Sequence, residues 1–115
     1  MSRDIFVQDL PKEAETVGEI PSDFEPRSLG PSKELVRRIQ VAVPEANFSD
    51  TEWGVIDGPG SSIEVNIRES NAVQAFALHV RGDASADEII ARILSGLELR
   101  ALDPDSPTGF FRGPG

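Results

Sequence analysis

The sequence predicts an α+β domain of two layers, in which two helices pack on one face of an antiparallel meander sheet. Short segments that alternate apolar and polar residues recur along the chain, and this period of two is typical of strands with one exposed face. Two other segments space their apolar residues three or four positions apart, as a helix requires. The segments follow in the order β-α-β-β-β-α-β, and the short turns between the middle strands favour antiparallel pairing.

The first predicted strand covers residues 4–10, DIFVQDL, and ends at Pro11. Residues 11–31 follow as a long connection that contains four prolines. Within it, Thr16 and Glu19 have the spacing of a capping box, which predicts one helical turn. We expect apolar side chains to anchor this connection as a packed loop on the surface: Val17, Ile20, Phe24 and Leu29.

Two amphipathic segments predict the helices. The first begins at Ser32, which we expect to be its N-cap, and runs to about Val43. The second follows a capping box of Ser85 and Glu88, and Gly96 has the place expected of a helix C-terminus. The apolar stripes of the two helices are expected to form one core with the strands that lie between them: Leu35, Ile39, Ile89, Ile93 and Leu94 against Ile63, Val65, Ile67, Phe76, Leu78 and Val80.

Three strands are predicted between the helices, at residues 51–57, 62–68 and 72–81, and a last one, LELRALD, follows the second helix. The chain is long enough for one core, so we expect a single domain over residues 1–103. Residues 104–115 form a Pro/Gly-rich tail, which is expected to fray unless its two phenylalanines dock: Phe110 and Phe111.

Composition excludes several classes of function. A net charge of −9 argues against nucleic-acid partners and anionic membrane surfaces, which require clustered Lys and Arg. With no cysteine and one histidine, the chain shows no spacing typical of a metal or cofactor site, and we assign neither. No apolar run approaches the length of a bilayer span and no secretory signal pattern is present, so a cytoplasmic location is expected. The oligomeric state stays open.

The single histidine, His79, falls on the sheet face away from the helices, because it alternates with the apolar residues of its strand. Matching apolar residues across the ESN turn places Glu64 and Asn66 beside it, with two alanines as neighbours. A slip of one residue would bury a charged row, so this register is strongly favoured. The predicted binding residues on this face are therefore Glu64, Asn66, His79 and Arg81.

This polar face has three interpretations. It is an ordinary solvated sheet face, or a docking surface for a protein, or an active site. In the last case His79 would be a general base that Glu64 orients, and Arg81 would stabilise an anion. A flat meander offers no concave pocket, so we favour binding over catalysis. The acidic stretches at residues 13–25 and 45–57 are a second candidate contact surface for a partner with a basic surface.

Two motifs with superficial ligand-binding character carry little weight. DGPGSS at residues 57–62 lacks the Lys-Ser/Thr of a phosphate-binding loop and is expected to be a hairpin turn. DPDSPTG at residues 103–109 begins like a calcium loop but has proline at the third ligand position and no bidentate glutamate after it. Neither motif predicts a reaction.

Several short stretches resemble a group of small, acidic, uncharacterised bacterial proteins: VQDLP, WGV, SIEVNI, LHVRG and RALDPDSPTGFF. The resemblance implies a bacterial source and a stand-alone domain, and it transfers no functional residue. Small acidic bacterial proteins are also frequent among immunity proteins, which neutralise a toxin by binding it, although this analogy rests on size and charge alone. We therefore expect a protein-interaction or accessory module, immunity-like in character, rather than an enzyme. The alternative is a small hydrolase or ligand-binding domain that uses His79, Arg81 and Glu64.

Overall fold

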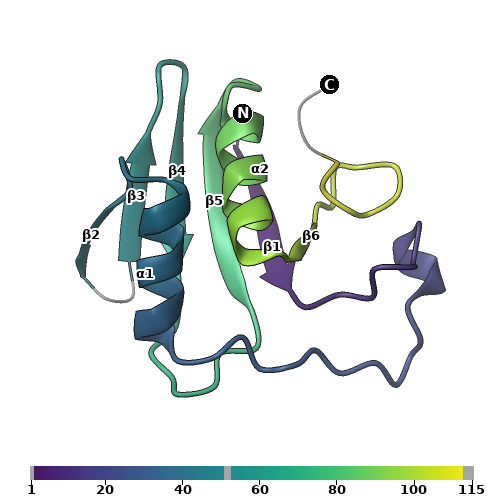
Figure 1. The fold of residues 1–115 in the computed structure, drawn as a ribbon. Coiled ribbons are helices and arrows are strands. Elements are labelled where there is room, and N and C mark those ends of the chain that lie inside the picture. The colour runs from purple at the N-terminus through teal and green to yellow at the C-terminus, as the bar shows by residue number, and fades with distance from the viewer. Residues whose placement is uncertain (1, 51–52, 113–115) are drawn as a thin grey trace.

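A computed structural model describes residues 2–50 and 53–112, and it confirms the α+β class. In these ranges an antiparallel sheet of six strands, in the order β2-β3-β4-β5-β1-β6, carries two helices side by side on one face (Figure 1). The elements are β1 (Ser2–Gln8), the 3-10 turn η1 (Val17–Glu19), α1 (Ser32–Ala42), β2 (Asn47–Asp50), β3 (Trp53–Asp57), β4 (Ser61–Asn66), β5 (Phe76–Gly82), α2 (Ala86–Leu97) and β6 (Arg100–Leu102). Neither helix is long and apolar enough to cross a membrane.

The sheet contains the predicted meander with one strand more than expected. β3, β4 and β5 pair in sequence, and Glu64 stands opposite His79 as the alternation requires. The additional strand is β2, which pairs with β3 through Asn47 and Val55. β1 does not lie at an edge but between β5 and β6, so the N-terminal strand has neighbours from the second half of the chain.

The strand predicted at 72–81 begins later, at Phe76, because the preceding residues pair with the long connection instead. Val73 N donates to Gly30 O at 2.9 Å, and Val73 O accepts from Leu29 N. The side chain of Val73 is buried in the core, while its backbone forms both hydrogen bonds with residues 29 and 30 of the long connection. The connection is therefore tied to the sheet end before α1 begins.

The predicted core is confirmed. All of the helix and strand residues expected to share it are buried in one cluster between the helices and the sheet. β1 and β6 add Ile5, Val7 and Ala101 to the same cluster.

The predicted N-cap Ser32 is wrong, whereas Ser85 is the N-cap of α2 by position but makes no capping bond. The residue before α1 is Pro31, with φ −65° and ψ 145°, and Ser32 is already helical and buried. The Ser32 hydroxyl accepts a bond from the Ser70 amide, so the loop after β4 uses it. Ser85 has helical dihedrals and makes no capping bond; its hydroxyl lies 2.9 Å from that of Ser61 in β4. In both cases a contact distant in sequence replaces the local cap.

Gly96 does not end its helix either. α2 continues to Leu97, and Glu98 takes the left-handed conformation, with φ 55°, that a glycine usually supplies. Gly96 instead faces α1, where an added Cβ would come within 2.7 Å of the Ala42 Cβ. The glycine therefore allows the two helices to approach each other closely.

The long connection and the C-terminal segment pack together beside β6. Their contact forms a second, smaller cluster of buried residues, Leu10, Ala14 and Phe110, which we call the satellite core. Of the four predicted anchors, Ile20 and Phe24 pack on the satellite core and Leu29 on the main core, whereas Val17 is 41% exposed. The predicted helical turn is present as η1, and Thr16 N donates to Glu19 Oε2 at 2.9 Å.

The two phenylalanines of the C-terminal segment dock on the rest of the fold, so residues 104–112 do not fray. Phe110 is 2% exposed and its backbone forms a β-bridge with Leu102, while Phe111 N donates to Ala101 O at 3.0 Å. The long connection joins the same contact through Val17 N and Thr108 O, 2.9 Å apart. Residues 113–115 lie outside the described part of the chain.

Candidate functional site

The four predicted site residues lie together on the sheet face opposite the helices, which we call the open face. Glu64 is opposite His79, Asn66 is opposite Ala77 and Ser62 is opposite Arg81. The face is not flat, as the sequence suggested, because a hollow of about 330 Å³ lies over it. Four neighbouring strands, β3, β4, β5 and β1, line this hollow. Its lining residues are Ser2, Arg3, Asp4, Trp53, Glu64, Asn66, His79, Val80 and Arg81.

His79 has a carboxylate partner that differs from the expected one. Its Nδ1 lies 2.6 Å from Oδ1 of Asp4, which stands directly opposite it on β1. Glu64 flanks His79 on the other side, from β4, but no hydrogen bond joins the two among the described residues. The role predicted for Glu64, orienting the imidazole, therefore belongs to Asp4.

The Asp4–His79 pair fixes how the imidazole presents itself. When the ring is neutral, a proton on Nδ1 is donated to the carboxylate, and the lone pair then resides on Nε2. The two side chains are 35% and 55% exposed, so water reaches both. Within residues 2–50 and 53–112, no hydroxyl is hydrogen-bonded to His79 and Arg81 forms no ion pair. The arrangement has a potential base and a cation but no positioned protein nucleophile.

Two exposed aromatic side chains on the open face were missed by the sequence analysis. Trp53 is 40% and Phe6 is 38% exposed. Register places them on one line across the sheet, since Trp53 pairs with Asn66, Asn66 with Ala77, and Ala77 with Phe6. We call these four residues the open row. A second hollow, of about 310 Å³, is lined in part by Phe6, Asn66 and Ala77 and by Arg68.

A signal for the open row exists in the sequence. Phe6 and Trp53 occupy the outward parity of their strands, because Phe6 lies between the buried Ile5 and Val7, and Trp53 alternates with the buried Gly54 and Ile56. An aromatic residue at such an outward position marks an exposed apolar patch. The alignment of the two across four strands needed the position of β1, which no local pattern supplies.

The two acidic stretches behave differently. In the stretch at 45–57, Glu45 is bound by Arg92 of α2 through two bonds of 3.0 and 3.2 Å. The hydrogen bond from Arg92, together with a backbone bond, lowers the pKa of the Glu45 carboxyl from its ordinary value. Residues 51 and 52 of this stretch lie outside the described residues. The stretch at 13–25 belongs to a pocket of about 570 Å³ in the long connection.

The calcium-like motif at 103–109 is a turn. Asp103 is 4% exposed, and its two carboxylate oxygens accept bonds from the Asp105 amide, at 3.0 Å, and from Arg3 Nη1, at 3.4 Å. Over the described ranges, no three His, Asp or Glu side chains are grouped as metal ligands would be.

No protein-family model, curated protein or solved structure matches the chain. The chemistry of the open face and of the pocket in the long connection is therefore the basis for assigning a function.

Proposed function

We propose that the chain is a protein-interaction module that docks a partner with a basic surface on its open face, as an immunity protein binds a toxin. The observation that carries the proposal is the open row, in which two exposed aromatic side chains are separated only by Asn66 and Ala77. The resemblance to small acidic bacterial proteins extends the proposal to a bacterial, cytoplasmic setting.

The shape of the open row suits a protein partner. Tryptophan and other aromatic residues dominate binding energy at interfaces when a partner removes them from water. Between Trp53 and Phe6 the side chains are short, so a partner can approach the sheet backbone closely. Each aromatic residue also borders one of the two hollows, which gives the partner's side chains places to enter.

The charges favour a basic partner. On the open face Asp4 and Glu64 flank His79 in the row next to the open row, and Arg81 and Arg68 line the two hollows, so the surplus of negative charge is that of the whole chain, −9. Such a charge accelerates encounter with a positive surface, and this acceleration falls as salt shortens the reach of the charges. We expect an association that is fast and sensitive to ionic strength.

The test begins with affinity capture from the native host and continues with the purified partner. For Trp53→Ala we expect binding weaker by about tenfold or more, the loss typical of a central aromatic residue. Val41→Ala is the matched control, because Val41 is 78% exposed on α1, on the helix-covered side. If Trp53→Ala and Val41→Ala bind the partner equally well, the open face is not the docking surface.

The alternative, a small hydrolase or ligand-binding domain, is favoured by one observation, the Asp4–His79 pair beside a hollow. In this case His79 would activate a water, Asp4 would hold its tautomer, and Glu64 and Arg81 would contact the substrate. Turnover of model esters or phosphoesters that disappears in both His79→Gln and Asp4→Asn would support it. Turnover unchanged by His79→Gln would exclude a base at this position.

A further inference from the structure

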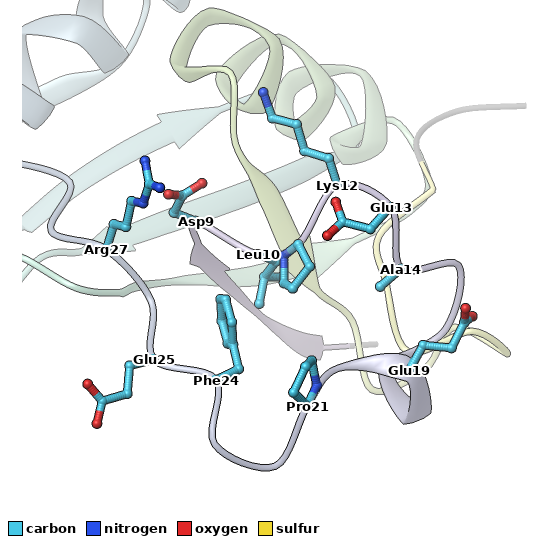
Figure 2. Close-up of a pocket in the computed structure, with 11 residues that line it drawn as sticks. Asp9, Leu10, Lys12, Glu13, Ala14, Glu19, Pro21, Phe24, Glu25 and Arg27 are labelled. Carbon is cyan, nitrogen blue, oxygen red and sulfur yellow. The ribbon is translucent and has the colours of Figure 1, made fainter.

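The long connection lines an open pocket of about 570 Å³, and none of the open-row residues borders it. Figure 2 shows its lining, which comes from residues 9–14, directly after β1, and from residues 19–27, which begin at the last residue of η1. We call it the loop pocket. Its size is within the range of ordinary ligand sites.

The floor of the loop pocket is apolar and fixed from below. Leu10 and Ala14 are buried in the satellite core, and the ring of Phe24 extends toward Leu10 (Figure 2). Arg100 of β6 secures this floor, because its Nη1 donates to the carbonyls of Pro11, at 2.5 Å, and Ala14, at 2.8 Å. These bonds hold the backbone at 11–14 in place, so the pocket does not have to be formed by its ligand.

The rim of the loop pocket carries more negative than positive charge. Its carboxylates are Asp9, Glu13, Glu19 and Glu25, and its cations are Lys12 and Arg27. Glu19 is occupied by the amides of Thr16 and Glu15. In the described part of the chain, the other three carboxylates form no ion pair. The Asp9 carboxylate points toward the guanidinium of Arg27 (Figure 2), so Glu13 and Glu25 are the two that face no cation of the rim.

We propose that the loop pocket binds an arginine side chain presented by a partner protein. The aliphatic stem of arginine would lie against Phe24, and its guanidinium would reach the carboxylate of Glu13, which lies on the other side of Leu10 (Figure 2). Glu25 lies on the opposite side of Phe24 and would add only its negative charge to the rim. The planar guanidinium can also stack on an aromatic ring, which the more strongly hydrated ammonium of lysine does less well. An anion would be repelled by the surplus of carboxylates, and a purely apolar ligand would leave them without a partner.

This inference concerns a surface distinct from the open face and does not rest on docking there. It assigns to the long connection a second contact, with its own chemistry. The length of a connection that has little regular structure is typical of functional loops.

The experiment is an NMR titration of the ¹⁵N-labelled full chain with a blocked pentapeptide, Gly-Ser-Arg-Ser-Gly. Its matched probe replaces arginine by citrulline, which has the same shape and no charge. We expect amide shifts confined to residues 9–27, and binding of the citrulline peptide weaker by about tenfold or more, since each tenfold is about 1.4 kcal/mol. Equal binding of the two peptides, or shifts spread over the whole acidic surface, would overturn the proposal.

Variants of the rim test the charges with opposite signs. Glu13→Gln/Glu25→Gln should weaken binding about tenfold, an amount typical of lost charge-assisted hydrogen bonds. Lys12→Met should strengthen it, which no damage to the fold would do. The control Glu69→Gln/Glu98→Gln removes the same amount of charge elsewhere and should bind the peptide as wild type does. If this control weakens binding as much as Glu13→Gln/Glu25→Gln, attraction to the net charge explains the result and the pocket is excluded.

Two further measurements distinguish the arginine site from docking on the open face and from a site for a small molecule. Trp53→Ala alters the open face and should leave peptide binding unchanged, so a failure of the docking proposal does not affect this measurement. Propylguanidine, a small molecule with the same guanidinium and no other charge, should bind more weakly than the peptide. If propylguanidine binds as tightly or more tightly, the pocket is a small-molecule site and the assignment to a partner protein is wrong.

Discussion

The main core and the satellite core are built in different ways. The main core lies between regular elements, and its residues follow the periods of helices and strands, as Ile63 and Val65 do in β4 and Ile90 and Ile93 do in α2. The satellite core brings together segments without regular structure, and it depends on a few specific bonds, above all those of Arg100. Periodic packing spreads stability over many residues, whereas irregular packing concentrates it in few. The first kind of core supports the sheet, and the second shapes the loop pocket.

The largest effect is expected in the main core. Ile93→Ala should lower the free energy of unfolding by about 2–5 kcal/mol, because the side chain is fully buried and its removal leaves a cavity. Urea unfolding followed by far-UV circular dichroism measures the loss. The exposed Val41→Ala gives the baseline and should change stability by no more than about 0.5 kcal/mol. A loss for Ile93→Ala within that baseline would contradict the packing of α2 on the sheet.

A smaller effect is expected where the two helices meet. Gly96→Ala should cost about 1–3 kcal/mol, because the new methyl group overlaps Ala42 and forces the helices apart. The double variant Gly96→Ala/Ala42→Gly exchanges the two side chains and should recover most of the loss. Thermal unfolding of both variants and of Ala42→Gly alone completes the cycle. Additive losses would mean that the close approach of the helices is unimportant.

A third variant, Arg100→Met, is expected to destabilise the satellite core and leave the main core unchanged. Arg100→Met keeps the length of the side chain but loses the bonds to Pro11 and Ala14 and the stacking on Phe110, where the guanidinium lies 3.8 Å from the ring centre. We expect faster amide hydrogen exchange in residues 9–20 and 104–112, with protection in β4 and α2 unchanged. The local loss should be about 1–3 kcal/mol, as for bonds to a charged group. Uniformly faster exchange would show that the cores form one cooperative unit.

The smallest effect concerns the ion pair that joins the end of α1 to α2. In the folded state Arg92 lowers the pKa of Glu45, so this pair stabilises the fold above the ordinary pKa of the carboxyl. The contribution disappears as the pH falls through the lowered pKa, where Glu45 becomes protonated. Glu45→Gln should therefore be slightly less stable than wild type at pH 7, and the difference should shrink as the pH falls through the lowered pKa, as urea midpoints would show. A difference that does not change with pH would have another cause.

Sequence reasoning succeeded where the information is local or periodic. The alternation of β4 and β5 predicted the register of Glu64 and His79 and the composition of the main core, because a slip would bury charges. Sequence reasoning failed where the partner of a side chain comes from a segment distant in the sequence. Asp4 reaches His79 only because β1 inserts beside β5, and the hydroxyl of Ser85, the N-cap of α2, contacts Ser61 instead of its own helix. These contacts join residues that are 75 and 24 positions apart, respectively.

The loop pocket shows the same limit in another form. Its acidic residues and Phe24 were recognised in the sequence, but the bonds that hold residues 11–14 in place come from Arg100, which is 89 positions from Pro11. The outward parity of Phe6 and Trp53 was likewise present in the sequence, but their alignment in one row depends on the places of β1 and β3 in the sheet. The composition therefore predicted which side chains the protein can use, and the topology of the sheet decided which of them lie together.

The position of β1 between β5 and β6 also has a consequence for biosynthesis. A ribosome makes the N-terminus first, so β1 leaves the exit tunnel before either of its hydrogen-bonding neighbours has been translated. The hairpins of β2 to β5 join neighbouring segments and can close early, whereas β1 must wait for pairing partners about 70 or more residues downstream. During that interval the apolar side chains of β1 have no sheet to cover them. The first strand is therefore exposed to chaperones and proteases for longer than the strands of the meander, and the sheet closes on both sides of it only after β5 and β6 have been made.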